Sequence, residues 1–78
     1  MNVTIKLHTT LKKFAPPETK GTIPMEFDPG ATAKTAAAHF EIPDDFVGAV
    51  FIDGQRADID TPLAEGMEVN FLAPIGGG

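Results

Sequence analysis

The 78-residue sequence contains no cysteine, serine or tyrosine. The absence of cysteine excludes disulfides, thiolate-ligated zinc or iron–sulfur sites and a thiol nucleophile. The absence of serine excludes serine-hydrolase chemistry. The two histidines, His8 and His39, lie far apart in the sequence. A zinc site would therefore have to recruit scattered carboxylates, and we expect no metal site.

Long apolar runs are also missing. The longest apolar stretches have about five residues, whereas a membrane-spanning helix needs about 20. Residues 1–7 alternate between apolar and polar side chains instead of forming the continuous apolar segment of a secretory signal. We therefore expect a cytoplasmic protein without a membrane partner.

Basic residues are few, because 6 Lys and Arg stand against 11 Asp and Glu, for a net charge of −5. Such a surface repels phosphate backbones, which argues against nucleic-acid binding. It suits a partner with a basic docking surface. A chain of this length forms one small domain with one modest core, which leaves no room for a deep cleft between two domains.

Period-two alternation of apolar and polar residues predicts strands, and a period of 3.6 predicts a helix. Asp53-Gly54 is a strong hairpin signal between two of the predicted strands. The element order ββαβββ predicts an α+β two-layer domain, and it fits a β-grasp with the first and last strands side by side in the middle of the sheet. The expected strands are 3–8, 22–27, 49–52, 55–58 and 67–71, and the expected helix is 32–40 with Thr32 as its N-cap.

Several residues between these elements are also expected to contribute to the core. Residues 10–15 can form one helical turn that buries Leu11 and Phe14. Phe46, in the irregular link that follows the helix, is expected to pack inward, and residues 61–63 are expected to form a short capped turn. Pro43 is expected to end the helix, because proline lacks the backbone N–H that the helix needs.

The glycine triplet at 76–78 follows directly after the last predicted strand. Ordering glycine costs more backbone entropy than ordering any other residue, so the triplet does not help the domain to fold. The five residues after Ala73 reach at most about 17 Å, and without side chains the glycines can enter a narrow tunnel. The alternative is a frayed terminus without a chemical role.

Three segments together carry a specific pattern. They read Gly-Ala-Val-Phe-Ile-Asp-Gly-Gln-Arg-Ala-Asp at 48–58, Asp-Thr-Pro-Leu-Ala-Glu-Gly-Met-Glu-Val at 60–69 and Pro-Ile-Gly-Gly-Gly at 74–78. In this order the segments closely resemble the ThiS/MoaD sulfur-carrier family, and the resemblance covers essentially the whole chain. The Pro-Ile that precedes the glycines makes the chain most similar to the small subunit of molybdopterin synthase.

The resemblance implies a ubiquitin-like β-grasp, with a mixed sheet of four to five strands packed on one main helix in residues 1–73. A flexible glycine tail at 74–78 follows. It implies a carrier without a cofactor of its own, rather than a self-sufficient enzyme. A ubiquitin-activating-type enzyme uses ATP to adenylate the carboxylate of Gly78, and a sulfur donor protein converts the adenylate into a thiocarboxylate. The large subunit of the synthase then receives the tail, with Gly76 and Gly77, in its active site.

Side-chain direction predicts the surface on which such a partner docks. If Val50 and Ile52 point into the core, Phe51 points outward, and it joins exposed residues of neighbouring strands beside the root of the tail. The alternative is that a loop covers Phe51. The predicted partner-binding residues are Lys6, His8, Phe51, Leu72, Pro74 and Ile75.

The same adenylate chemistry serves other ends, and the sequence leaves them open. The sulfur acceptor could belong to thiazole synthesis or to another sulfur pathway. A ubiquitin-like protein modifier would instead join Gly78 to a lysine of a target protein. A third alternative is an interaction module whose terminus is chemically idle.

Overall fold

The structure is a computed structural model, and it describes residues 1–74. Within this range no helix is long and apolar enough to cross a membrane. Short 3₁₀ helices lie in the connections, at Thr9–Phe14 (η1), Pro17–Thr19 (η2) and Asp44–Phe46 (η3). The strands are β1 (Asn2–Leu7), β2 (Thr22–Glu26), β3 (Ala49–Ile52), β4 (Gln55–Ala57) and β5 (Glu68–Leu72), and the α-helix is α1 (Ala33–His39).

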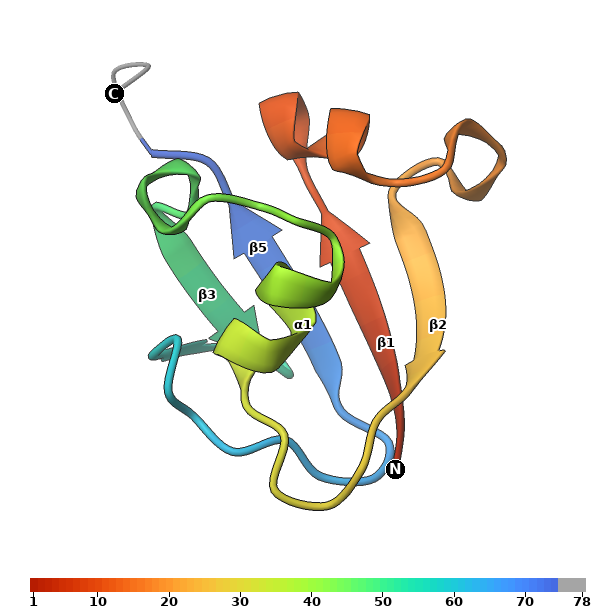
Figure 1. Cartoon of the computed structure of the whole chain (residues 1–78). Coiled ribbons are helices and arrows are strands. Elements are labelled where there is room, and N and C mark those ends of the chain that lie inside the picture. Colours follow the sequence, from red (N-terminus) through yellow and green to blue (C-terminus); the bar gives the residue numbers. More distant parts are fainter. Residues whose placement is uncertain (75–78) are drawn as a thin grey trace.

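The strands form one mixed sheet in the order β2-β1-β5-β3-β4 (Figure 1). The central pair, β1 and β5, is parallel, whereas β1–β2, β3–β5 and β3–β4 are antiparallel. The helix α1 crosses one face of this sheet, so the molecule has two layers. The predicted ubiquitin-like β-grasp, with its first and last strands side by side, is confirmed.

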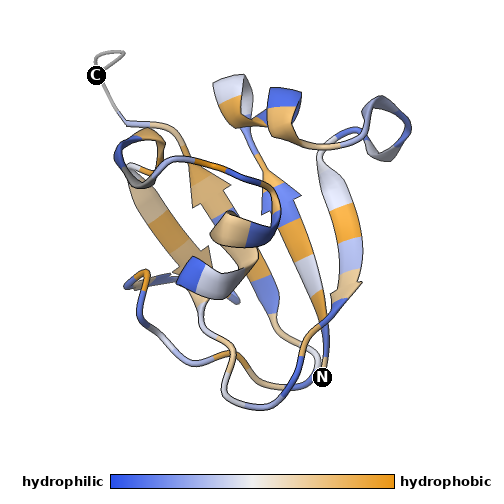
Figure 2. Ribbon diagram, viewed as in Figure 1, coloured by the Kyte–Doolittle hydropathy of each residue, from blue (hydrophilic) through white to orange (hydrophobic). Residues whose placement is uncertain are grey.

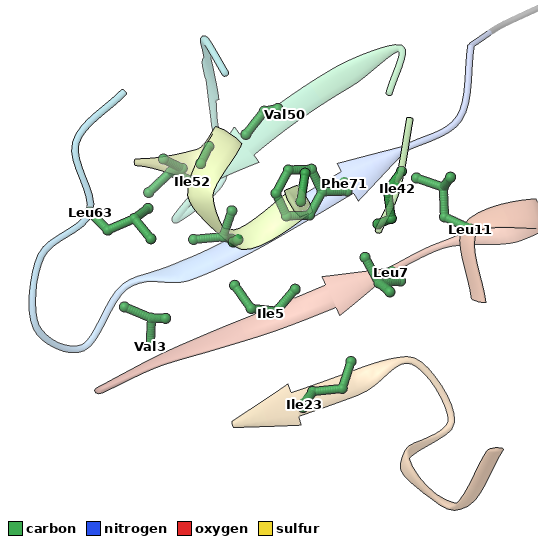
Figure 3. Packing of buried hydrophobic residues seen from close by; sticks show 14 of the residues in the cluster. Val3, Ile5, Leu7, Leu11, Ile23, Ile42, Val50, Ile52, Leu63 and Phe71 are labelled. Atoms are coloured by element: carbon green, nitrogen blue, oxygen red, sulfur yellow. The ribbon is translucent and has the colours of Figure 1, made fainter. Parts of the chain in front are cut away.

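The core lies between α1 and the sheet, and alternation along the central strands fills it (Figure 3). In β1 every second residue is buried, and in β5 Val69 and Phe71 are both completely shielded from solvent. Phe71 is the largest of the fully buried side chains. The buried residues are Val3, Ile5, Leu7, Leu11, Ala15, Ile23, Ala31, Ala33, Ala36, Ala37, Ile42, Val50, Ile52, Leu63, Val69 and Phe71.

The helix α1 begins with a capping box. The Thr35 N–H donates to Thr32 Oγ1 (3.4 Å), and the Thr32 N–H donates to Thr35 Oγ1 (3.0 Å). Its buried face consists of alanines, which let the helix backbone lie close to the sheet. The helix ends at His39, before the expected stop at Pro43, and Glu41 then takes a left-handed backbone conformation (φ 59°).

Strand β3 differs from β1 in its pattern, because it is apolar along its whole length (Figure 2). It still buries alternate residues, Val50 and Ile52. A two-residue turn links it to β4, with Asp53 (φ 50°) and Gly54 (φ 87°) both in the left-handed region. This is the conformation of a type I′ hairpin turn, and the hairpin prediction is confirmed.

Two of the expectations for the connecting segments are wrong. Within residues 1–74, Phe46 is the large apolar residue that is exposed on the surface, with 37% of its area accessible. The turn η3 places it edge-to-face against the half-buried Phe14, with ring centroids 6.0 Å apart. Ile42 and Leu11 are buried at that end of the core instead (Figure 3).

Residues 61–63 do not form a capped turn. They run extended, and Pro62 forms an isolated antiparallel bridge with Thr32, at the start of α1. The Leu63 N–H donates to the Ala31 carbonyl (2.9 Å), and the Leu63 side chain is buried. The segment therefore ties the N-terminus of α1 to the chain that leads into β5.

Candidate docking site at the root of the tail

The outer face of the sheet, which is the face away from α1, presents one row of residues that crosses all five strands. The strand registers pair Thr22 of β2 with Lys6 of β1, and Lys6 with Asn70 of β5. They also pair Asn70 with Phe51 of β3, and Phe51 with Arg56 of β4. Paired residues point to the same side of a sheet. The prediction that Phe51 points outward is confirmed, and its side chain is half-buried among these neighbours.

An apolar hollow lies on this face beside the point where the chain leaves β5. Carbon atoms form most of its surface. Phe51 lies on its floor together with Leu72, which is its diagonal neighbour because Ala49 pairs with Leu72. We call this feature the tail-root hollow, and its lining residues are Gly48, Ala49, Phe51, Arg56, Leu72, Ala73 and Pro74.

Arg56 is the cation of the tail-root hollow. Its guanidinium carbon lies 6.0 Å from the centre of the Phe51 ring, at the distance of a cation–π contact. A guanidinium beside an aromatic ring suits a partner surface with a carboxylate next to an apolar side chain. The hollow therefore combines apolar area with one oriented positive charge.

The two predicted basic residues lie on the same face but outside the hollow. Lys6 forms an ion pair with Glu68 (3.1 Å), in which the side chains are 35% and 41% exposed. An exposed ion pair of this kind contributes little to folding stability, but it means that the Lys6 ammonium group already has a carboxylate partner. His8 Nε2 lies 2.8 Å from Asn70 Oδ1, and Asn70 Nδ2 donates to the Phe51 carbonyl (3.4 Å). Asn70 accepts with its oxygen in this arrangement, so His8 donates from Nε2.

The structure thus brings together Phe51, Leu72 and Pro74. Lys6 pairs with Asn70 and His8 hydrogen-bonds to it, and neither residue lines the hollow. Sequence reasoning missed Arg56, although a two-residue turn at Asp53-Gly54 would have aligned it with Phe51. It also missed Gly48, Ala49 and Ala73, the residues of the lining whose side chains are too small to fill the hollow. Four predicted site residues, Ile75, Gly76, Gly77 and Gly78, lie outside the described residues.

The opposite end of the molecule contains a carboxylate with a shifted pKa. The Asn2 N–H donates to Glu65 Oε1 (2.9 Å), and this hydrogen bond holds the pKa of Glu65 below its usual range. Within residues 1–74 no three His, Asp or Glu side chains gather in an arrangement that could hold a metal ion.

Comparisons with known proteins identify the fold. No protein-family model matches the sequence, and no curated protein does. Among solved structures, SAMP1 from Haloferax volcanii superimposes with a TM-score of 0.71 at 23% identity, and the match covers 100% of both chains. A provisionally assigned molybdopterin converting factor, subunit 1, from Pyrococcus furiosus superimposes with a TM-score of 0.72 at 15% identity, over 96% of this chain and 99% of that one. The resemblance found in the sequence is thus confirmed at the level of the fold.

Proposed function

We propose that this chain is a sulfur carrier of the ThiS/MoaD kind, which bears a thiocarboxylate on Gly78 and acts as the small subunit of molybdopterin synthase. One observation above all supports the proposal: the central strand β5 leads into the glycine tail beside an apolar hollow that has one arginine. The end-to-end match to a provisionally assigned molybdopterin converting factor subunit adds to this support.

The chemistry begins with activation of the Gly78 carboxylate, which is a poor electrophile. One of its oxygens attacks the α-phosphorus of ATP on a ubiquitin-activating-type enzyme, and pyrophosphate leaves. The acyl adenylate then has a good leaving group. Attack by hydrosulfide expels AMP and leaves a thiocarboxylate. When a donor protein supplies the sulfur as a persulfide, attack on the adenylate expels AMP and forms an acyl disulfide, and a thiol then cleaves this bond, releasing the thiocarboxylate while the thiol and the donor sulfur form a disulfide. Because the chain has no cysteine, its terminus is where it can hold transferable sulfur.

The folded domain binds the partner enzyme, and this binding brings the tail to the partner's active site. Phe51 and Leu72 offer apolar area to the adenylating enzyme and then to the large synthase subunit, while Arg56 orients the contact. The tail beyond Pro74 spans at most about 14 Å, so the reacting centre of each partner must lie within that distance of the hollow. The proposal places these steps in the cytoplasm.

Intact mass spectrometry tests the proposal. The chain is incubated with ATP, sulfide and the adenylating enzyme of its own host, and a gain of about 16 Da is expected because sulfur replaces one oxygen. A chain with the same hollow but with the Gly78 carboxylate blocked as a carboxamide is the matched control, and its mass should not change because it has no carboxylate oxygen to adenylate. If the full chain keeps its unmodified mass while the enzyme adenylates another carrier, the proposal is wrong.

The same experiment in cells separates the carrier from a protein modifier. A modifier forms an isopeptide bond between Gly78 and a lysine, with loss of AMP from the same adenylate. A ladder of higher-mass conjugates that depends on Gly78 would therefore support the modifier. For the carrier we expect the free chain with the added sulfur and no ladder.

A further inference from the structure

Gly48 lies directly beneath the chain that leaves β5. Its N–H donates to the Leu72 carbonyl (2.7 Å), just beyond Ala49 and Leu72, the last register pair of β3 and β5 on the side of the tail. The backbone of Ala73 and Pro74 then passes across the Cα atom of Gly48. A Cβ atom at position 48 would lie 2.5 Å from Pro74 Cα, 2.7 Å from Pro74 N and 2.8 Å from the Ala73 oxygen.

These contacts are all with backbone atoms, so no rotation of a neighbouring side chain could relieve them. Heavy atoms of this kind pack at about 3.5–4.0 Å, and any residue other than glycine would push the Ala73–Pro74 segment outward. The backbone conformation of Gly48 is not the reason for the glycine. The glycines with positive φ in the described part of the chain are Gly21, Gly30, Gly54 and Gly66. Position 48 therefore requires glycine because a Cβ atom would not fit against the Ala73–Pro74 backbone.

We propose that Gly48 is a positioning residue for the tail. Because Gly48 has no side chain, the Ala73–Pro74 backbone can pack against the start of β3, and this contact sets the direction in which the chain leaves the hollow. Pro74 maintains that direction, because its ring fixes φ near −65°. The consequence for catalysis rests on the proposed function, whereas the contact itself does not.

The position of the tail root matters because docking and reaction depend on different parts of the molecule. Phe51, Leu72 and Arg56 bind the partner, and they remain on their strands when residue 48 changes. The reacting carboxyl must reach the ATP site from that fixed base. A misplacement of about 1 Å in a reacting group can cost up to about 100-fold in rate. Gly48→Ala should therefore act on kcat of adenylation far more than on KM.

The first test measures the contact without any partner. In NMR spectra of the full chain we expect NOEs between the Gly48 Hα and Pro74 protons. Gly48→Ala should remove the close approach and shift the amide signals of residues 72 and 73, while signals of the buried residues of β1 stay in place. Absence of the Gly48–Pro74 NOEs in the unmodified chain would overturn the proposal, whatever the function of the protein.

The second test measures ATP–pyrophosphate exchange with the adenylating enzyme of the host. Gly48→Ala is expected to lower kcat about tenfold, with KM for the carrier changed less than about twofold. The matched control is Gly54→Ala, which strains a positive φ in open space and so lowers the Tm without touching the tail. It should leave both constants unchanged.

A Gly48→Ala chain with the kcat of the unmodified protein would show that Gly48 does not position the tail. If this variant does not fold, Pro74→Gly is the second variant, because it leaves β3 intact and frees the fixed φ at the tail root. The same fall in kcat is then expected, and an unchanged kcat would contradict the proposal. If the unmodified chain is not adenylated at all, the proposed function fails, while the NMR result still decides the role of Gly48 as a spacer.

Discussion

Phe51 is the residue on which the docking account depends most. It lies half-buried on the outer face, between Asn70 and Arg56, on the floor of the tail-root hollow. Phe51→Asp replaces the ring with a charge, so we expect binding to the adenylating enzyme to weaken at least about tenfold. The cost in folding stability should be about 1 kcal/mol, because the side chain is not part of the core. Isothermal titration and thermal unfolding measure the two effects.

Thr22→Asp is the matched control for this variant. Thr22 is exposed on β2, and it pairs with Lys6 on the edge of the sheet away from the hollow. The same charge placed there should leave partner affinity unchanged. Equal loss of affinity in both variants would show that the negative charge acts at long range, and that Phe51 is not a contact.

Glu65 provides a prediction for the pH dependence of stability. Its pKa is lowered from 4.5 in the folded chain, first of all by the hydrogen bond from the Asn2 N–H. The unfolded chain therefore binds more protons at this residue in acid. The contribution of Glu65 to stability is complete above the unfolded pKa and is lost as the pH falls through the lower, folded value.

Glu65→Gln should thus flatten the fall in unfolding free energy as the pH drops below about 5, through the unfolded pKa and then the lower, folded pKa of Glu65. Urea unfolding at several pH values measures this slope. A slope that is the same in both proteins would mean that the Asn2–Glu65 hydrogen bond is absent in solution.

At the scale of elements, α1 is short and docks through alanines, so its N-terminal cap contributes much of its stability. Thr32→Ala removes the side chain that accepts from the Thr35 N–H. We expect a loss of about 1 kcal/mol, which lowers the Tm of a domain of this size by about 4–8 °C. Calorimetry of Thr32→Ala and Thr32→Ser decides the question, because serine keeps the capping oxygen. Equal Tm values for the two variants would exclude the cap as the cause.

The elements themselves could be predicted where a local pattern determines them. Alternation located β1 and β5, and Asp53-Gly54 located the hairpin, because these signals act between near neighbours. Phe46 was placed wrongly because the core volume near η3 is filled by Leu11 and Ile42, from other parts of the chain. Residues 61–63 were placed wrongly because their partner, Thr32, is distant in the sequence.

At the scale of the whole molecule, the candidate site combines segments that no local pattern joins. Phe51 and Leu72 could be recognised because each is an apolar exception to alternation on its own strand. Arg56 depends on the register of β4 against β3, and Gly48 depends on the approach of the Pro74 backbone. The parallel pairing of β1 with β5, which places the tail root at the centre of one end, followed from the order of the elements along the chain rather than from periodicity.

Every proposed step depends on sulfur carried at the Gly78 carboxyl, and the protein isolated from its own host shows whether that sulfur is present. Intact mass spectrometry followed by fragmentation locates any added mass along the chain. The account predicts a fraction of molecules heavier by about 16 Da, with the increase confined to the fragment that contains Gly78. Chains that carry only the unmodified carboxylate under conditions of active cofactor synthesis, or mature chains that continue beyond Gly78, would contradict it.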